Sequence, residues 1–140
     1  MLRGIARGFV LAALAALAGA CGSTTTVTAP TVVTITESYS GTLIPASAGT
    51  FTFTTLTGGA VLATVQTLGP DSTKTVGFSL GTYAAGVCTV ILDNAAATQG
   101  FTFTAATSSI GTYCVRIYDN GSTTADNIPY TYTLAVAHPQ

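Results

Sequence analysis

The chain has 140 residues, of which only 6% are charged and 48% are hydrophobic. A length of this order suits one domain with a single core. After residue 23 there are 28 threonines, so hydroxyl groups take the place of the missing charges. From residue 21 onward, two basic residues (Lys74 and Arg116) stand against five acidic ones, a net charge of −3. Two cations cannot form a basic patch, which excludes nucleic acid as a partner.

Residues 1–20 have the features of a secretory signal peptide. Arg3 and Arg7 give a basic start without any acidic residue. The apolar run that follows, at 9–17, has the length of a signal core and is too short to span a bilayer. We therefore expect the protein to be exported.

Two cleavage sites fit this signal. Ala18 and Ala20 form the A-x-A pattern of an ordinary signal peptidase site. The same residues before Cys21 resemble a bacterial lipobox, whose cysteine is diacylated, although Ala18 stands where the lipobox prefers leucine. An exported protein with three cysteines leaves one over when the other two pair. Because Cys88 and Cys114 can form that pair, we expect Cys21 to be the site of lipid attachment.

Residues 21–33 are rich in threonine, contain Pro30 and carry no charge. This composition is typical of a flexible tether, with a reach of roughly 20 Å for such a length. The alternative is that part of the segment pairs as an edge strand. Gly22 after the cysteine resembles outer-membrane sorting in Gram-negative bacteria, so we expect an outer-membrane lipoprotein held by acyl chains on Cys21.

From residue 34 onward apolar and polar residues alternate, and turn residues interrupt the pattern about every ten positions. No window shows a convincing helical period. The expected fold class is all-β, an antiparallel two-sheet sandwich of about eight strands over residues 34–140. A closed barrel is the alternative. The predicted strands are 34–44, 50–57, 60–68, 74–82, 87–93, 100–106, 111–119 and 130–137.

Alternation also assigns the faces of the strands. Phe51 and Phe53 share one face, with threonines on the other, which is typical of a half-buried strand. In the same way Val115 points to the core and Cys114 points away from it. Two thiols in an oxidising compartment normally pair. We therefore predict a disulfide between Cys88 and Cys114 that clamps two strands from the outside.

Three strand patterns carry a resemblance to a known family. They are Phe51-x-Phe53, Gly111-x-Tyr113-x-Val115-x-Ile117 and Tyr132-x-Leu134-x-Val136. Over about residues 35–137 the chain resembles the bacterial pre-peptidase C-terminal domain. The resemblance implies a jelly-roll-type sandwich that acts as a non-catalytic accessory module of secreted peptidases. Here the predicted lipid anchor, rather than a peptidase, precedes the domain.

The segment 77–81 matches the G-x-S-x-G pattern of serine hydrolases, with Ser79 at its centre. That motif works on a sharp turn between a strand and a helix, whereas here it lies inside a predicted strand. The single histidine, His138, stands in what we expect to be a frayed terminus, a poor place for a general base. No catalytic residue and no cofactor are predicted.

Three aspartates followed by asparagine, Asp93, Asp119 and Asp126, are weak candidates for calcium ligands in loops. The alternative is that such residues favour turns because they bond to their own backbone. Four tyrosines could stack on sugars, and the alternative is that they pack between strands. They are Tyr39, Tyr83, Tyr118 and Tyr130.

The function expected from the sequence is that of a non-catalytic cell-surface or periplasmic lipoprotein. Its sandwich would bind an extracellular protein or polysaccharide. The alternative is a structural envelope or fibre-forming protein. That alternative is favoured by the single lysine after residue 21, which leaves the sheet edges without the charged residues that normally prevent edge pairing.

Overall fold

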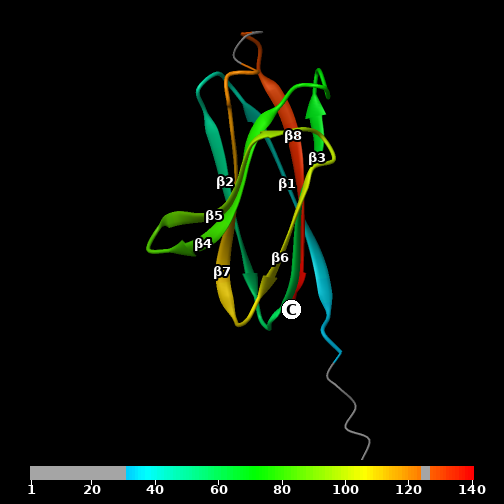
Figure 1. The fold of residues 1–140 in the computed structure, drawn as a ribbon, viewed down its shortest axis with the longest axis vertical. Helices are drawn as coiled ribbons and strands as arrows, with labels where there is room; N and C mark the ends of the chain where they lie inside the picture. The colour runs from blue at the N-terminus through cyan, green and yellow to red at the C-terminus, as the bar shows by residue number, and fades with distance from the viewer. Residues whose placement is uncertain (1–30, 124–126) are drawn as a thin grey trace, which may run out of the picture. The chain divides into compact units, whose positions relative to one another are not determined.

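The computed structural model describes residues 31–123 and 127–140, and all of its regular elements are strands (Figure 1). No helix in the described part of the chain could cross a membrane. The strands are β1 (Thr34–Leu43), β2 (Ala48–Thr55), β3 (Gly59–Gly69), β4 (Val76–Ala84), β5 (Val87–Ala97), β6 (Thr102–Thr107), β7 (Gly111–Tyr118) and β8 (Tyr130–Pro139).

The strands form two antiparallel sheets of four. Sheet A has the order β1-β8-β3-β6, and sheet B has the order β2-β7-β4-β5. Every connection between consecutive strands passes from one sheet to the other, except the β4–β5 hairpin. The prediction of a two-sheet sandwich is therefore confirmed. A barrel does not form, because no strand pairing among the described residues joins the two sheets.

Two strands run further than the alternation predicts. β5 continues through Asn94 to Ala97 because Ala97 pairs with Val76 at the start of β4. β8 continues to Pro139 because that residue pairs with Thr34 at the start of β1. In both cases the neighbouring strand supplies hydrogen bonds where the local sequence alone indicates a turn or a frayed end.

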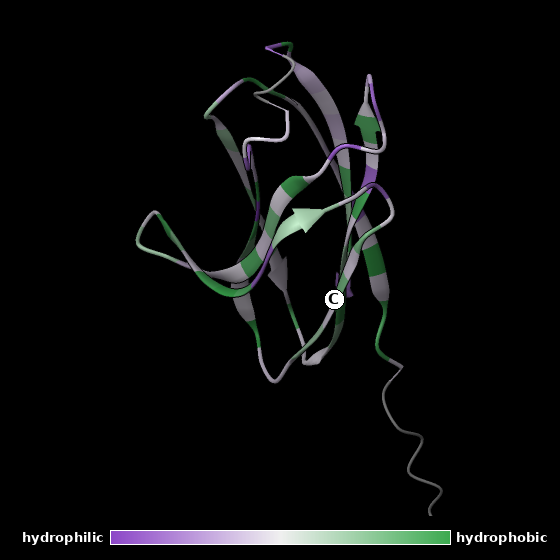
Figure 2. Cartoon of the chain, turned by 45° about the horizontal axis from the view of Figure 1, so that its top comes forward, coloured by the Kyte–Doolittle hydropathy of each residue, from purple (hydrophilic) through white to green (hydrophobic). Residues whose placement is uncertain are grey.

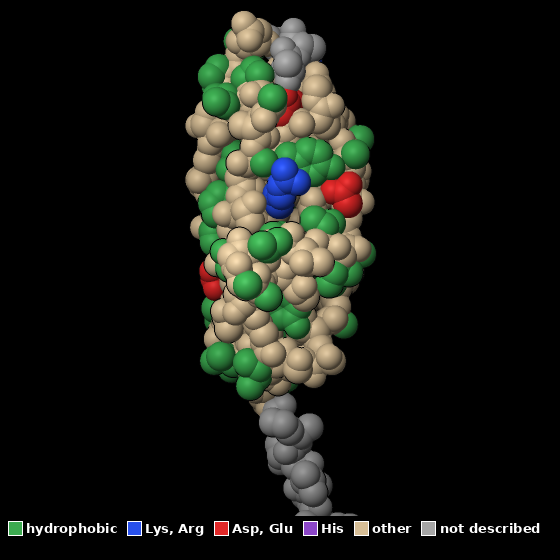
Figure 3. Space-filling view, turned by 90° about the vertical axis from the view of Figure 1, so that its left-hand side faces the viewer, with side chains coloured by type: hydrophobic (Ala, Val, Ile, Leu, Met, Phe, Trp, Pro, Cys, Tyr) green, Lys and Arg blue, Asp and Glu red, His purple; other side chains and the backbone are tan. Residues whose placement is uncertain are grey.

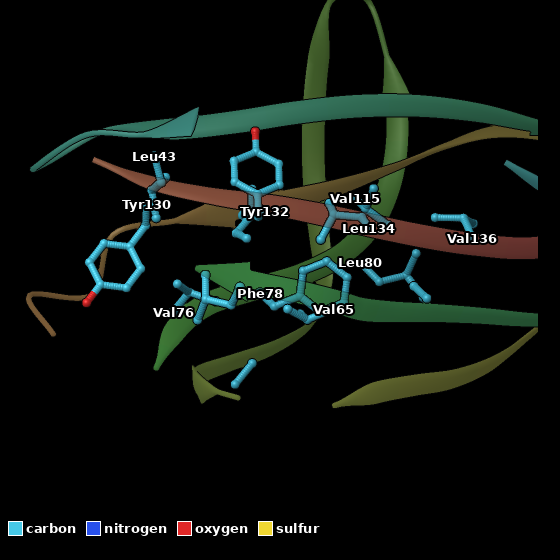
Figure 4. Packing of buried hydrophobic residues seen from close by; sticks show 14 of the residues in the cluster. Leu43, Val65, Val76, Phe78, Leu80, Val115, Tyr130, Tyr132, Leu134 and Val136 are labelled. Carbon is cyan, nitrogen blue, oxygen red and sulfur yellow. The ribbon is translucent and has the colours of Figure 1, made fainter. Parts of the chain in front are cut away.

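The core lies between the two sheets, where the inward-facing side chains of both meet (Figure 4). Hydrophobic and polar residues alternate along the strands, as Figure 2 shows by colour. The pattern at Phe53 follows the prediction, since this ring is buried while the neighbouring Thr52 and Thr54 are exposed. The largest fully buried hydrophobic side chains are those of Tyr130, Phe78, Leu43, Ile117 and Leu134.

The β4–β5 hairpin departs from the plane of its sheet (Figure 1). Its tip is the two-residue turn Ala85-Gly86, in which both residues have positive φ, 50° and 82°. Such a turn matches the twist of the flanking strands. The ladder shifts register between Leu80 and Gly81, and bulges of this kind bend the strands that carry them. A Cβ at position 81 would lie 2.1 Å from the carbonyl oxygen of Thr89, so only glycine permits this close approach.

Candidate functional site

The bent hairpin is fastened to the outer face of sheet B by a disulfide. Cys88 in β5 and Cys114 in β7 are bonded, with a Cα–Cα distance of 5.9 Å. β4 lies between these two strands in the sheet, and strands two places apart in a flat sheet would stand roughly 10 Å apart. The shorter distance therefore reflects the bend of the hairpin toward β7. The predicted disulfide is confirmed, and it clamps the hairpin from outside the core.

Between the hairpin tip and the outer face of the sheet lies a groove of about 400 Å³, which we call the hairpin groove. Its sheet wall is formed by Thr50 and Thr52 of β2 and Arg116 of β7. Its hairpin wall consists of Tyr83, Gly86, Val87, Cys88 and Val90. The lining therefore combines hydroxyl groups, one guanidinium, one aromatic ring and two aliphatic side chains.

Arg116 is held in position by its neighbour on the same face of β7. Its guanidinium carbon lies 5.1 Å from the centre of the Tyr118 ring, a cation–π contact. The Tyr118 hydroxyl donates to the carboxylate of Asp93 and stands 3.1 Å from both of its oxygens. Burial, and next the bond to Asp93, raise the pKa of Tyr118. Figure 3 faces this side of the molecule, where a basic side chain lies among hydrophobic ones.

Ser79 lies in the middle of β4, and its hydroxyl donates to Asp93 at 2.8 Å. Its side chain is buried, and no helix follows it in the part of the chain that the structure describes. His138 belongs to β8 in the other sheet. The residues of the G-x-S-x-G pattern therefore do not assemble a nucleophile with a base.

His138 corrects the prediction of a frayed terminus. Its side chain is fully buried, and its ring packs against Phe53 at a centroid distance of 5.1 Å. Its Nε2 atom lies 3.0 Å from Glu37 Oε1, while Gln140 donates to its Nδ1 at 3.4 Å. These two bonds fit the tautomer that carries its proton on Nε2. The frayed end is absent because β8 pairs with β1 as far as Pro139.

Glu37 also accepts a hydrogen bond from the hydroxyl of Tyr39, which lies 3.0 Å from the backbone carbonyl oxygen of Thr52 in the opposite sheet. The bond from Tyr39 is the main reason why the pKa of Glu37 is lowered, and His138 lowers it further against the effect of burial. Burial, and next the bond to Glu37, raise the pKa of Tyr39. This group joins β1, β2 and β8 at one edge of the sandwich.

The calcium candidates are not brought together in the described part of the chain. Asp93 lies within β5 rather than in a loop, and its oxygens accept bonds from Ser79 and Tyr118. Asp119 follows β7 and accepts bonds from the backbone of Ala46 and Gly121 and from the hydroxyl of Thr123. No three acidic, histidine or cysteine side chains among the described residues are placed to hold a metal ion. Asp126 lies outside those residues.

Of the four candidate tyrosines, only Tyr83 lines the hairpin groove. Tyr130 is fully buried in the core, so it packs between strands and is not available to stack on a sugar. Tyr39 is half-buried and stacks on Phe51 with a centroid distance of 5.0 Å. Cys21, the predicted lipid attachment site, lies outside the described residues.

The sequence pattern does not single out three of the groove residues, Arg116, Val87 and Val90. One feature of the sequence does point to Arg116: it is the only cation in any predicted strand after residue 82, and it lies two residues from Cys114. What the sequence could not indicate is the bend that brings the hairpin over this arginine.

A smaller cavity of about 90 Å³ opens between the sheets, lined mainly by apolar residues that include Phe53, Leu80, Ile91 and Tyr113.

Comparison with known proteins gives a likeness of fold. No protein-family model and no curated protein matches the chain, and the resemblance to the pre-peptidase C-terminal domain therefore rests on its strand patterns. Among solved structures, the chain is similar to PliG from Aeromonas hydrophila, a periplasmic inhibitor of g-type lysozyme. The TM-score is 0.52 at 18% identity, over 75% of this chain and 86% of PliG. A likeness at this identity shows that the two proteins share a β-sandwich architecture.

Proposed function

We propose that this protein is an exported, non-catalytic β-sandwich module that binds a protein partner in the bacterial cell envelope. Binding takes place on the outer face of sheet B, through the β4–β5 hairpin and the hairpin groove. The first partner to test is a lysozyme of the g type.

The single observation that carries this proposal is the clamped hairpin. Val87 and Val90 of β5 expose 61% and 43% of their surfaces and line the groove that contains Arg116. Exposed aliphatic groups next to arginine and tyrosine are the composition of protein-binding surfaces. The disulfide restrains the hairpin, so little conformational freedom is lost when a partner binds.

Two further observations support the proposal. Ser79 is committed to a bond with Asp93, and His138 lies in the other sheet, an arrangement that favours a binding role over hydrolysis. PliG, whose sandwich this chain resembles, inhibits a lysozyme and therefore acts on another protein.

For the rest of the chain we propose a signal peptide at 1–20, lipidation at Cys21, a tether over 21–33 and the sandwich over 34–140. The start of β1 at Thr34 supports this division. A tether would hold the sandwich away from the outer membrane, so that its binding face remains accessible.

The test uses the full chain with Cys21→Ser, exported to a bacterial periplasm so that the disulfide forms without lipid. The purified protein is added to g-type lysozyme, and the clearing of a peptidoglycan suspension is followed. We expect inhibition that saturates at equal molar amounts, and direct binding by calorimetry. The double variant Val87→Ser/Val90→Ser should weaken inhibition by about tenfold or more, because it removes two exposed apolar groups from the lining of the groove.

Ile110→Ser is the control, since Ile110 is also an exposed aliphatic residue but lies in the loop before β7, outside the groove. It should leave inhibition unchanged. Absence of both binding and inhibition would reject g-type lysozyme as the partner, and equal loss in both variants would reject this face as the binding surface.

A structural role is the second candidate function. It is favoured by the strand edges, because Lys74 lies between β3 and β4 and no strand in the described residues contains lysine. Edge strands without such charges can pair between molecules. Sedimentation of the same protein over a range of concentrations would reveal reversible oligomers if this role were correct, and a constant monomer would contradict it.

A further inference from the structure

We propose that the hairpin groove binds a carboxylate group on a peptide segment of the partner, with the guanidinium of Arg116 as its anchor. This inference rests on the proposed function, because it names the chemistry by which the partner protein is recognised. It assigns an acidic side chain, flanked by aliphatic residues, as the group that enters the groove.

Arg116 has no acidic partner within the described residues. Its guanidinium lies against the Tyr118 ring, 5.1 Å from the ring centre. The nearby carboxylate of Asp93 instead accepts hydrogen bonds from Ser79 and Tyr118. The half-buried guanidinium therefore presents its donors to the groove, and a carboxylate is the group that matches their planar fork.

The side chain of Arg116 is also preorganised for binding. The Tyr118 ring lies directly over Gly77, where a Cβ would come within 2.0 Å of the ring. The hydroxyl of the same ring is fixed by Asp93. Because the ring is held at both its face and its tip, the arginine side chain stacked on it loses little rotamer freedom on binding an anion.

Three hydroxyl groups share the groove with Arg116. Thr50 is paired directly with Arg116 across the β2–β7 ladder, and Thr52 follows on the same face. Among the described residues, no hydrogen bond uses the hydroxyl of Thr50, Thr52 or Tyr83. These neutral donors line the groove beside the guanidinium and can satisfy carboxylate lone pairs that Arg116 leaves open.

Charge and shape then select the kind of segment. The groove contains one cation, but the domain as a whole has a net charge of −3. A partner segment with many acidic groups would therefore be repelled by the negative charge of the domain around the groove. A single carboxylate is matched by the single guanidinium. The aliphatic side chains of Val87 and Val90 on the opposite wall favour apolar flanks. Since Tyr83 is the only aromatic ring in the lining, this composition favours a peptide over an acidic polysaccharide.

The test follows the ¹⁵N-labelled protein, as the full chain with Cys21→Ser, by NMR. The probe is a blocked pentapeptide of sequence alanine-valine-glutamate-valine-alanine, and its glutamine counterpart is the reference. We expect the glutamate peptide to shift the Arg116 Nε–Hε signal and the amides of Thr50 and Thr52. Its affinity should exceed that of the glutamine peptide by about tenfold, the ratio expected of one charge-assisted pair, and should fall as salt is added.

Arg116→Met should remove this preference while keeping the aliphatic stem on the Tyr118 ring. Arg116→Lys should restore only part of it, because lysine lacks the planar fork. Lys74→Met is the matched control, since it changes the net charge equally but lies outside the groove; it should bind like the parent. A preference for the glutamate peptide that survives Arg116→Met, or shifts confined to another face, would overturn the inference.

Two further arms keep the inference separate from its alternatives. If a digalacturonate probe binds through Arg116 and the glutamate peptide does not, the groove is an acidic-sugar site and the inference is overturned. If g-type lysozyme is inhibited equally by the parent and by Arg116→Met, the proposed function stands and the carboxylate site fails. If the glutamate peptide binds through Arg116 and lysozyme does not, the carboxylate site stands and only the choice of partner fails.

Discussion

His138 Nε2 and Glu37 Oε1 lie 3.0 Å apart, joining the last residues of β8 to the middle of β1. The histidine is fully buried, and the carboxylate also receives a hydrogen bond from Tyr39. Through Tyr39, which stacks on Phe51 of β2, the same group connects sheet A to sheet B. The C-terminal residues of β8 therefore help to hold the two sheets together at this edge of the sandwich.

The first prediction concerns acid stability. The pKa of Glu37 is lowered in the folded protein from its ordinary value of 4.5, so its contribution is present above that pH and is lost as the pH falls through the folded pKa. Denaturation by urea should therefore require less urea as the pH drops below about 4.5. Glu37→Gln should be less stable at neutral pH and should show a smaller loss on acidification. Parallel acid profiles for parent and variant would contradict this role.

The second prediction concerns the buried histidine. His138→Ala leaves a cavity beside Phe53 and removes the hydrogen bond to Glu37, so the free energy of unfolding should fall by about 3 kcal/mol. Urea denaturation followed by tyrosine fluorescence measures this loss. Gln140→Ala, which removes the 3.4 Å bond to the other ring nitrogen and an exposed bond to the Thr54 carbonyl oxygen, is the control and should cost under about 1 kcal/mol. A neutral His138→Ala would show that the C-terminal end of β8 adds nothing to the fold.

The third prediction concerns the disulfide. The bond spans 26 residues, for which loop-closure entropy gives about 3 kcal/mol of stabilisation. Cys88→Ser/Cys114→Ser should lose this amount, and hydrogen exchange should rise first in the hairpin tip around Ala85 and Gly86. The strands of sheet A should keep their protection, because the bond lies outside the core. Equal melting of the parent with and without reductant would show that the clamp adds no stability.

The fourth prediction concerns the bend in the hairpin. In Gly81→Ala the new methyl group would meet the Thr89 carbonyl oxygen, so the hairpin must move away and stability should fall by about 1–3 kcal/mol. Gly69→Ala is the matched control, because a Cβ there meets only the Thr131 hydroxyl oxygen at 3.5 Å, an ordinary contact. It should be close to neutral. Thermal melts of the two variants distinguish the cases, and equal values would show that position 81 tolerates a side chain.

The fifth prediction concerns the anchor. If Cys21 is diacylated, metabolic labelling with palmitate in a Gram-negative host should mark the parent protein and spare Cys21→Ala. The parent should fractionate with the outer membrane, whereas the variant should be released from the cells or the membrane fraction. Cys88→Ser/Cys114→Ser, which keeps Cys21, should still be labelled. Equal labelling of the parent and Cys21→Ala would show that Cys21 is not the site of lipid attachment.

The alternation of side chains allowed the strands and their buried faces to be predicted from the sequence. Phe53 and Val115 point to the core, and the threonines beside Phe53 are exposed, because a strand places successive side chains on opposite faces whatever its neighbours are. The Cys88–Cys114 pair could also be predicted, since it needed only an oxidising compartment and two available thiols. These features depend on local chemistry and composition.

The tertiary structure decided the features that depend on which strands are neighbours. His138 is buried because β1 runs beside β8 as far as Pro139, and Asn94 lies in a strand because β4 pairs with β5 as far as Ala97. Arg116 lines a groove because the register shift at Gly81 bends the hairpin over β7. The alternation of apolar and polar residues encodes none of these contacts. It fixes which face of the sheet a side chain is on, but it does not determine which residue of another strand lies beside it. The pairing of strands distant in sequence, set by the packing of the whole core, supplied that information.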